Sequence, residues 1–151
     1  MKRTKKFLAI VLTAVLFVLS SQHVNASECK YYNVVEKNPY TNNIADGLGR
    51  PSKDTCVNLV VKELTFAGVA DHSVLYSNSC FTGKDNPAYD ITNYSGSELK
   101  VKVHSMSTFL TVCTIKVPAN ETLSGTLSGV KADKKYYLTF DAPSDFSGKV
   151  F

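Results

Sequence analysis

Residues 98–105 read ELKVKVHS, and this short stretch decides the fold class. Leu99, Val101 and Val103 are apolar, and they alternate with charged or polar residues. An alternation with a period of two is the pattern of a β-strand that buries one face and exposes the other. We therefore expect a half-buried strand at this point of the chain.

The residues that follow extend the same pattern. The stretch 108–117, TFLTVCTIKV, is rich in the β-branched and aromatic residues that favour strands. Counting in twos places Phe109 and Cys113 on one face together with Ile115 and Val117, so we expect that face to be buried.

The rest of the chain alternates between strand patterns and turn patterns. Further strands are expected at 29–36, 73–81, 89–94, 122–129, 135–140 and 149–151. Asn, Gly, Pro and Asp predict a long loop over 38–54 and turns at 118–121, 131–135 and 141–148. The segment 54–66 is ambiguous, because its valines fit a strand and also a short helix, and we favour the strand.

Short strands separated by turns at about ten-residue spacing are typical of a sandwich or barrel. The fold class we expect is all-β, with a single-domain β-sandwich of jelly-roll or Ig-like type.

The N-terminal stretch has the features of a secretory signal peptide. An apolar run over 7–19 follows four basic residues, and small residues precede Ser27. A membrane-spanning helix needs about 20 apolar residues, so the run is too short to be a span. We expect cleavage after Ala26, which divides the chain into a leader, 1–26, and a secreted domain, 27–151, with no membrane span.

Removal of the leader changes the charge of the protein. The whole chain has 17 basic and 13 acidic residues. Four basic residues and no acidic residue lie in 1–26, so the remaining chain has 13 of each. A nucleic-acid-binding domain usually carries a basic excess. We therefore expect no nucleic-acid partner.

All four cysteines, Cys29, Cys56, Cys80 and Cys113, follow the leader. An even number of cysteines in an exported chain predicts two disulfides, and the pairing stays open among three connectivities. Metal binding is the alternative, but zinc sites favour closely spaced cysteine pairs, and no two of these cysteines are that close. We expect no metal site and no cofactor.

The stretch 115–140, IKVPANETLSGTLSGVKADKKYYLTF, resembles bacterial secreted β-sandwiches in its strand spacing and turns. These include pre-peptidase-type and carbohydrate-binding domains. The resemblance covers the last third of the chain and implies a sandwich, but it implies no site residues.

No catalytic constellation stands out. Asp71, His72 and Ser73 are consecutive, and a turn explains them better than a triad does, since a triad needs a base held between two partners. The carboxylate pairs Asp85/Asp90 and Asp141/Asp145 flank turn sequences and match no calcium-binding pattern.

Candidate ligand-binding residues come from tyrosines and isolated cations. Tyr94 and Tyr137 are candidates because a tyrosine combines an apolar ring with a polar tip. Arg50 and Lys53 lie in the predicted long loop, and His104 ends the polar face of the 98–105 strand beside two lysines.

We expect a small secreted binding protein without enzymatic activity, located outside the cell or in the periplasm where an outer membrane exists. Its expected ligand is a cell-envelope glycan or a partner protein. The first alternative is an effector or toxin-like protein that acts on other cells. A small hydrolase with dispersed catalytic residues is a weaker alternative.

Overall fold

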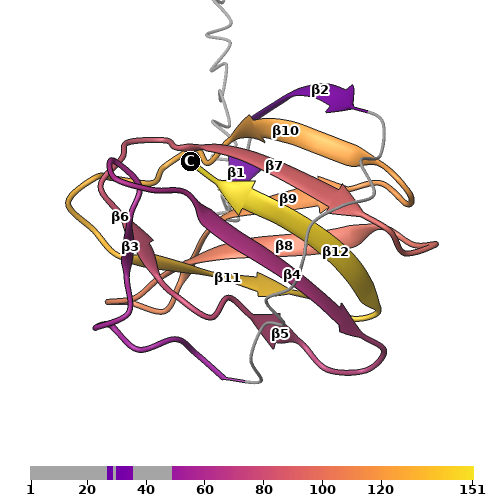
Figure 1. Ribbon diagram of the computed structural model, residues 1–151, viewed down its shortest axis with the longest axis horizontal. Helices are drawn as coiled ribbons and strands as arrows, with labels where there is room; N and C mark the ends of the chain where they lie inside the picture. Colours follow the sequence, from indigo (N-terminus) through magenta and orange to yellow (C-terminus); the bar gives the residue numbers. More distant parts are fainter. Residues whose placement is uncertain (1–26, 29, 36–48) are drawn as a thin grey trace, which may run out of the picture.

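The computed structural model describes residues 27–28, 30–35 and 49–151, and these form two β-sheets packed face to face (Figure 1). The expected all-β sandwich is therefore confirmed. The predicted leader, 1–26, lies outside the described residues, as do Cys29, residues 36–37 and the 38–48 part of the predicted long loop.

The first sheet has seven strands. Its order is β1 (Ser27–Glu28), β9 (Thr111–Val117), β8 (Leu99–Ser105), β11 (Tyr136–Phe140), β6 (Phe81–Thr82) and β3 (Val57–Asn58). The seventh strand, β5 (Leu75–Tyr76), also pairs with β11. The pairs β1–β9 and β3–β6 are parallel, and the other pairs are antiparallel.

The second sheet has five strands, all paired antiparallel. Its order is β2 (Lys30–Val35), β10 (Thr122–Thr126), β7 (Ala88–Asn93), β12 (Ser144–Val150) and β4 (Leu64–Ala70).

The core between the sheets follows from the alternation in the sequence. Leu99, Val101 and Val103 of β8 are fully buried, and Phe146 of β12 belongs to the same cluster. Burial of each such side chain contributes about 1.5–3 kcal/mol. Cys113 is also fully buried, as expected.

Phe109 departs from the expected pattern. It lies in the turn between β8 and β9, where it is 46% exposed and has a φ of 61°. The prediction was wrong because β9 begins only at Thr111 and the β8–β9 register shifts between Val103 and His104. The two-residue alternation counted back from Cys113 does not continue across such an irregularity.

The strand favoured for 54–66 is present in two pieces, while the turn predicted at 141–148 is wrong. The segment 54–66 contains no helix, because a turn that exposes Val60 and Val61 separates β3 from β4. The segment 141–148 is mostly strand β12 rather than a turn. The composition of 141–148 suggests a turn partly because of Gly148, but this glycine lies within the strand. A Cβ atom there would lie 2.5 Å from the Asp90 carbonyl oxygen and 2.8 Å from the Phe66 ring. Packing demands a small residue in this strand.

One disulfide, Cys56–Cys80, lies within the described residues, where the sequence predicts two in the whole chain. It joins the segment before β3 to the segment before β6. No described cysteine is a free thiol. A second bridge would involve Cys29, which lies outside the described residues.

Strands β5 and β6 run beside β11 as one interrupted strand. In the interruption, the Ser77 N–H donates to the Leu138 carbonyl oxygen at 3.0 Å. The Leu138 N–H in turn donates to the Ser77 hydroxyl oxygen at 3.0 Å, and both residues are fully buried. The Ser77 side chain thus replaces a backbone acceptor of the sheet.

We expect Ser77→Ala to lower the free energy of unfolding by about 1–3 kcal/mol, because it leaves the buried Leu138 N–H without an acceptor. Urea denaturation measures this change. Ser73→Ala, at an exposed serine in the β4–β5 turn, is the control and should stay near the wild type. Equal stabilities of the two variants would contradict this account of Ser77.

Candidate functional site

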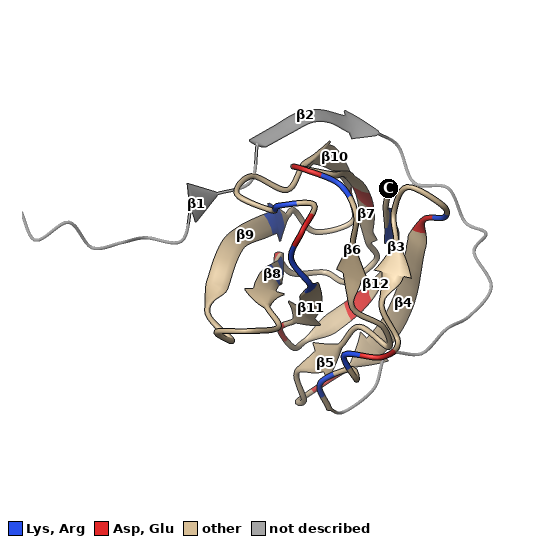
Figure 2. Cartoon of the chain, turned by 90° about the vertical axis from the view of Figure 1, so that its left-hand side faces the viewer, with Lys and Arg blue, Asp and Glu red and all other residues tan. Residues whose placement is uncertain are grey.

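Three segments meet at one end of the first sheet, and we call this region the loop end: residues 49–55, 106–110 and 131–135. The Met106 N–H donates to the Lys135 carbonyl oxygen at 2.9 Å, and Lys135 Nζ donates to the Lys53 carbonyl oxygen at 2.9 Å. The Arg50 guanidinium carbon lies 4.4 Å from the centre of the Phe109 ring. Figure 2 looks from this side of the molecule and shows basic and acidic residues alternating along the loops.

A second, small cluster of buried side chains lies under the loop end. Cys80, Met106 and Tyr137 are buried there, and Cys56 and Tyr76 pack against them. Tyr137 faces away from the main core, yet it is only 2% exposed. The disulfide and the loop above it cover the outer face of the sheet at this point.

Tyr137 is the middle ring of a stack of three, which we call the ring stack. The Tyr76 and Tyr137 ring centres are 6.2 Å apart, and those of His104 and Tyr137 are 5.0 Å apart. Neighbouring strands β5, β11 and β8 supply the rings, and Tyr137 pairs directly with His104 in the ladder. Cross-strand aromatic pairs of this kind stabilise a sheet.

His104 is half-buried and surrounded by hydrogen-bond partners. Its Nε2 lies 2.9 Å from the Thr139 hydroxyl oxygen, and its Nδ1 lies 3.4 Å from that of Thr111. Burial lowers the pKa of His104 below its usual value of about 6.5, and the nearby cations Lys102 and Arg50 act in the same direction. A hydrogen bond with the Phe109 backbone and the charge of Asp141 partly oppose this shift. The neutral imidazole is therefore favoured in the folded protein.

Arg50 connects the ring stack to the surface. Burial raises the pKa of Tyr137, while the charge of Arg50 and its hydrogen bond to the Tyr137 side chain oppose that rise. The same guanidinium group lies over Phe109. Arg50 thus holds the loop 49–55 against the ring stack and the 106–110 turn at once.

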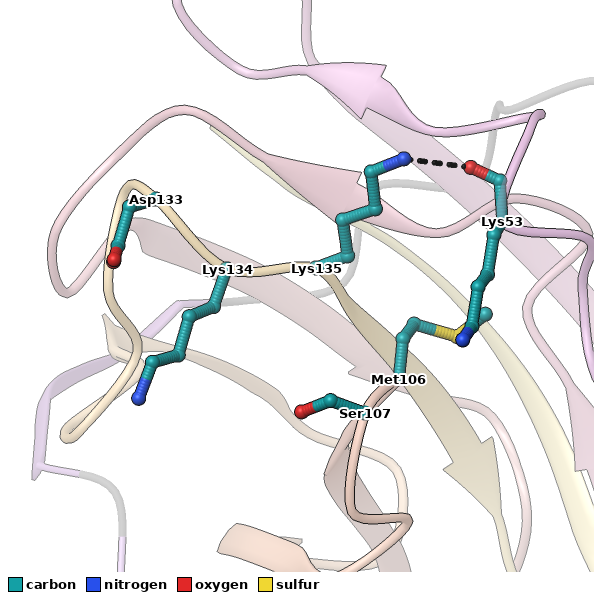
Figure 3. Close-up of a pocket in the computed structure, with 6 residues that line it drawn as sticks. All are labelled: Lys53, Met106, Ser107, Asp133, Lys134 and Lys135. Atoms are coloured by element: carbon teal, nitrogen blue, oxygen red, sulfur yellow. Dashed lines mark hydrogen bonds between the residues drawn. The ribbon is translucent and has the colours of Figure 1, made fainter.

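Beside the ring stack lies an open hollow of about 270 Å³, which we call the lysine depression (Figure 3). Lys53, Met106, Ser107, Asp133, Lys134 and Lys135 line it. Met106 is buried in the cluster below, so the apolar part of the lining is firmly held.

The turn 106–110, which we call the Phe109 turn, exposes two neighbouring apolar side chains. Phe109 is 46% exposed and Leu110 is 69% exposed. The Ser105 N–H donates to the Leu110 carbonyl oxygen at 3.0 Å, and the Phe109 N–H donates to the Ser105 carbonyl oxygen at 2.9 Å. These two backbone hydrogen bonds close the turn.

The structure brings together four of the five residues that the sequence singled out. Arg50, His104 and Tyr137 meet at the ring stack, and Lys53 lines the adjoining depression. Tyr94 lies apart, because its hydroxyl oxygen is 2.9 Å from that of Ser147 in β12 of the second sheet.

Sequence reasoning missed Met106, Ser107, Phe109, Leu110 and Lys134 as candidate site residues. The STFL sequence between two strong strand patterns was a usable signal, since a turn in that position would expose Phe109 and Leu110. The contact between this turn and residues 131–135 has no local signal in the sequence.

Neither histidine forms a catalytic triad in the described part of the chain. His72 is exposed in the β4–β5 turn. His104 faces threonine hydroxyl groups, while both carboxylate oxygens of the nearby Asp141 accept hydrogen bonds from Lys102, at 2.9 and 2.7 Å.

The described residues show neither a metal-binding cluster nor a membrane-spanning helix. They contain no group of three or more His, Cys, Asp or Glu side chains placed to hold a metal ion. They also contain no helix with the length and apolar character to cross a membrane.

Comparisons with protein-family models, with curated protein sequences and with solved structures found no match. Functional inference therefore rests on the geometry of the loop end.

The lowered pKa of His104 predicts a pH-dependent stability. Since the unfolded chain binds the proton more readily than the folded chain does, the stabilising contribution is fully present above a pH of about 6.5 and is lost as the pH falls through the lower folded pKa. We expect the free energy of unfolding, measured with urea, to fall from about pH 7.5 to about pH 5.

The variant His104→Gln should show a smaller fall over the same range, because it removes the titrating group. His72→Gln, at the exposed histidine, is the matched control and should keep the wild-type pH profile. If His104→Gln shows the same pH dependence as the wild type, His104 does not cause it.

Proposed function

We propose that this protein is a non-enzymatic binding domain that works outside the cytoplasm, and that the loop end contacts a partner protein. The observation that carries the proposal is the exposure of Phe109 and Leu110 on a hydrogen-bonded turn beside Arg50. Aromatic residues, Met and Arg are enriched at protein interfaces, and Arg and large aromatic side chains often dominate the binding energy. A turn that is already ordered loses little conformational entropy on binding.

The location follows from a separate line of reasoning. The Cys56–Cys80 disulfide suggests an oxidising compartment, since disulfides are rare in the cytoplasm. The basic and apolar leader over 1–26 supports export. We therefore propose secretion, into the periplasm where an outer membrane exists.

A cell-envelope glycan is the second candidate ligand, and the lysines of the depression favour it if the glycan is anionic. A neutral glycan would need exposed aromatic faces for stacking. Tyr76 and Tyr137 stack on each other instead, and Tyr137 is almost fully buried. This arrangement supports a protein ligand over a neutral glycan. An effector or toxin-like role remains the alternative to a simple binding domain, and it would also begin with recognition of a target protein.

The double variant Phe109→Ser/Leu110→Ser should lose partner binding. Wild-type and variant proteins, immobilised at equal density, are incubated with soluble extracytoplasmic protein and separately with insoluble cell-wall material. We expect a protein captured by the wild type to bind the variant at least about tenfold more weakly, the equivalent of about 1.4 kcal/mol.

Val60→Ser/Val61→Ser is the matched control, because these residues form another exposed apolar pair, 69% and 80% exposed, in the β3–β4 turn. It should bind like the wild type, and circular dichroism should show both variants folded. The proposal would be contradicted if the Phe109/Leu110 variant still captured the protein while the Val60/Val61 control did not. It would also be contradicted if the wild type were retained only on cell-wall material.

Export has its own test. Trypsin digestion of protein from the extracytoplasmic fraction should give a reduced and alkylated N-terminal peptide covering Ser27–Lys30, because Lys30 is the first basic residue after the leader. Recovery of the peptide 7–30 instead would show that the leader is retained.

A further inference from the structure

We infer that the lysine depression is a carboxylate-binding site, which receives an Asp or Glu side chain of the partner protein. This inference rests on the proposed function and adds the chemical character of the partner. The partner surface would carry an acidic residue next to an apolar one, so that the first enters the depression while the second covers the Phe109 turn.

The position of the depression is the first argument. Met106 and Ser107 line it, and they belong to the same five-residue turn that exposes Phe109 and Leu110. One partner segment can therefore contact both features. Figure 3 shows that the Lys134 side chain and the Ser107 hydroxyl extend into the space between the 131–135 loop and this turn.

The charge balance is the second argument. Three lysines and one aspartate line the depression, which gives it a formal charge of +2. The Lys135 ammonium group donates to the Lys53 carbonyl oxygen. Among the described residues, Lys53 and Lys134 have no ion-pair partner, and Asp133 forms no ion pair with either of them. Two ammonium groups are thus available to an anion, in a chain whose secreted part is close to neutral.

Two carboxylates beside the lining loops have hydrogen-bond partners of their own. Asp85 accepts from the Ala132 N–H at 3.1 Å. The nearby Asp54 carboxylate accepts from the Ser52 hydroxyl at 3.4 Å, within its own turn. Ser105 and Ser107 share a hydrogen bond of 2.9 Å in which either hydroxyl can donate. When Ser105 donates, the Ser107 O–H is free to donate to a bound carboxylate.

The size of the depression is the third argument. Ligand pockets that enclose a drug-sized molecule have volumes of about 300–1,000 Å³. A hollow of about 270 Å³ that is open to solvent suits a single side chain of a larger ligand. Its lining offers separate ammonium point charges and an apolar thioether, which fits a carboxylate on a short aliphatic stem.

The test is an NMR titration of the ¹⁵N-labelled protein, residues 27–151, with acetyl-Leu-Glu-Leu-amide as the probe. Acetyl-Leu-Gln-Leu-amide and inorganic phosphate are titrated in parallel. We expect saturable shifts of the Met106, Ser107 and Lys134 amide signals with the Glu peptide, with a Kd of about 1 mM. The Gln peptide and phosphate should bind much more weakly.

Two lysine variants and one control decide the assignment. Lys53→Gln and Lys134→Gln should each weaken binding of the Glu peptide about two- to fivefold, as expected for an exposed ion pair. The double variant should abolish saturation. Lys100→Gln, at an exposed lysine of β8 outside the depression, should leave binding unchanged.

Equal shifts with the Gln peptide, tighter binding of phosphate, or unchanged binding in the double variant would each overturn the inference. These results are independent of the partner-capture experiment. If the depression fails this test while capture still depends on Phe109 and Leu110, the carboxylate site is wrong and the proposed function stands.

Discussion

Strand β11 is buried on both faces, and the loop end depends on this constraint. All five of its residues, Tyr136–Phe140, are buried. Tyr136, Leu138 and Phe140 belong to the core between the sheets, and Tyr137 belongs to the outer cluster. A sandwich strand usually leaves one face to solvent, so burial of the outer face requires a cover. Here the Cys56–Cys80 bridge, Tyr76 and Met106 provide it.

This cover also fixes the positions of the loops at the loop end, although their sequences are typical of flexible loops. The disulfide joins two segments beside β11. A disulfide typically stabilises the folded state by about 2–4 kcal/mol, because it restricts the unfolded chain. Arg50 then packs against the ring stack and over Phe109, and Lys135 binds the Lys53 carbonyl oxygen. Each loop of the loop end is therefore attached to the sheet or to another loop. Attachment of this kind holds the polar groups of the loop end in fixed positions.

Much of the fold could be predicted from the sequence, and less of the site. Alternation identified β8 and β11 because each strand carries its pattern within five to seven residues. It failed for β12, whose Ser, Asp and Gly residues resemble a turn, although close packing leaves no room for a Cβ atom at Gly148. It also failed at Phe109, because a register shift ended the period of two. Periodicity puts Tyr136 and Tyr137 on opposite faces of their strand, but it cannot show that a distant disulfide covers the outer face. Arg50, Lys53 and His104 were chosen for their chemistry, and only tertiary contacts bring them together.

The backbone of Phe109 is strained, and this strain bears on the proposed function. A bulky residue with a φ of 61° is uncommon, and such conformations cost about 1–3 kcal/mol. Glycine or asparagine would relieve the strain at this position, yet the chain carries an aromatic residue there and leaves it half exposed. Folding alone gains little from an exposed ring, although the contact with Arg50 offsets part of the cost. Under the proposed function, a partner that covers Phe109 would bury the ring, and the free energy of that burial would offset the strain.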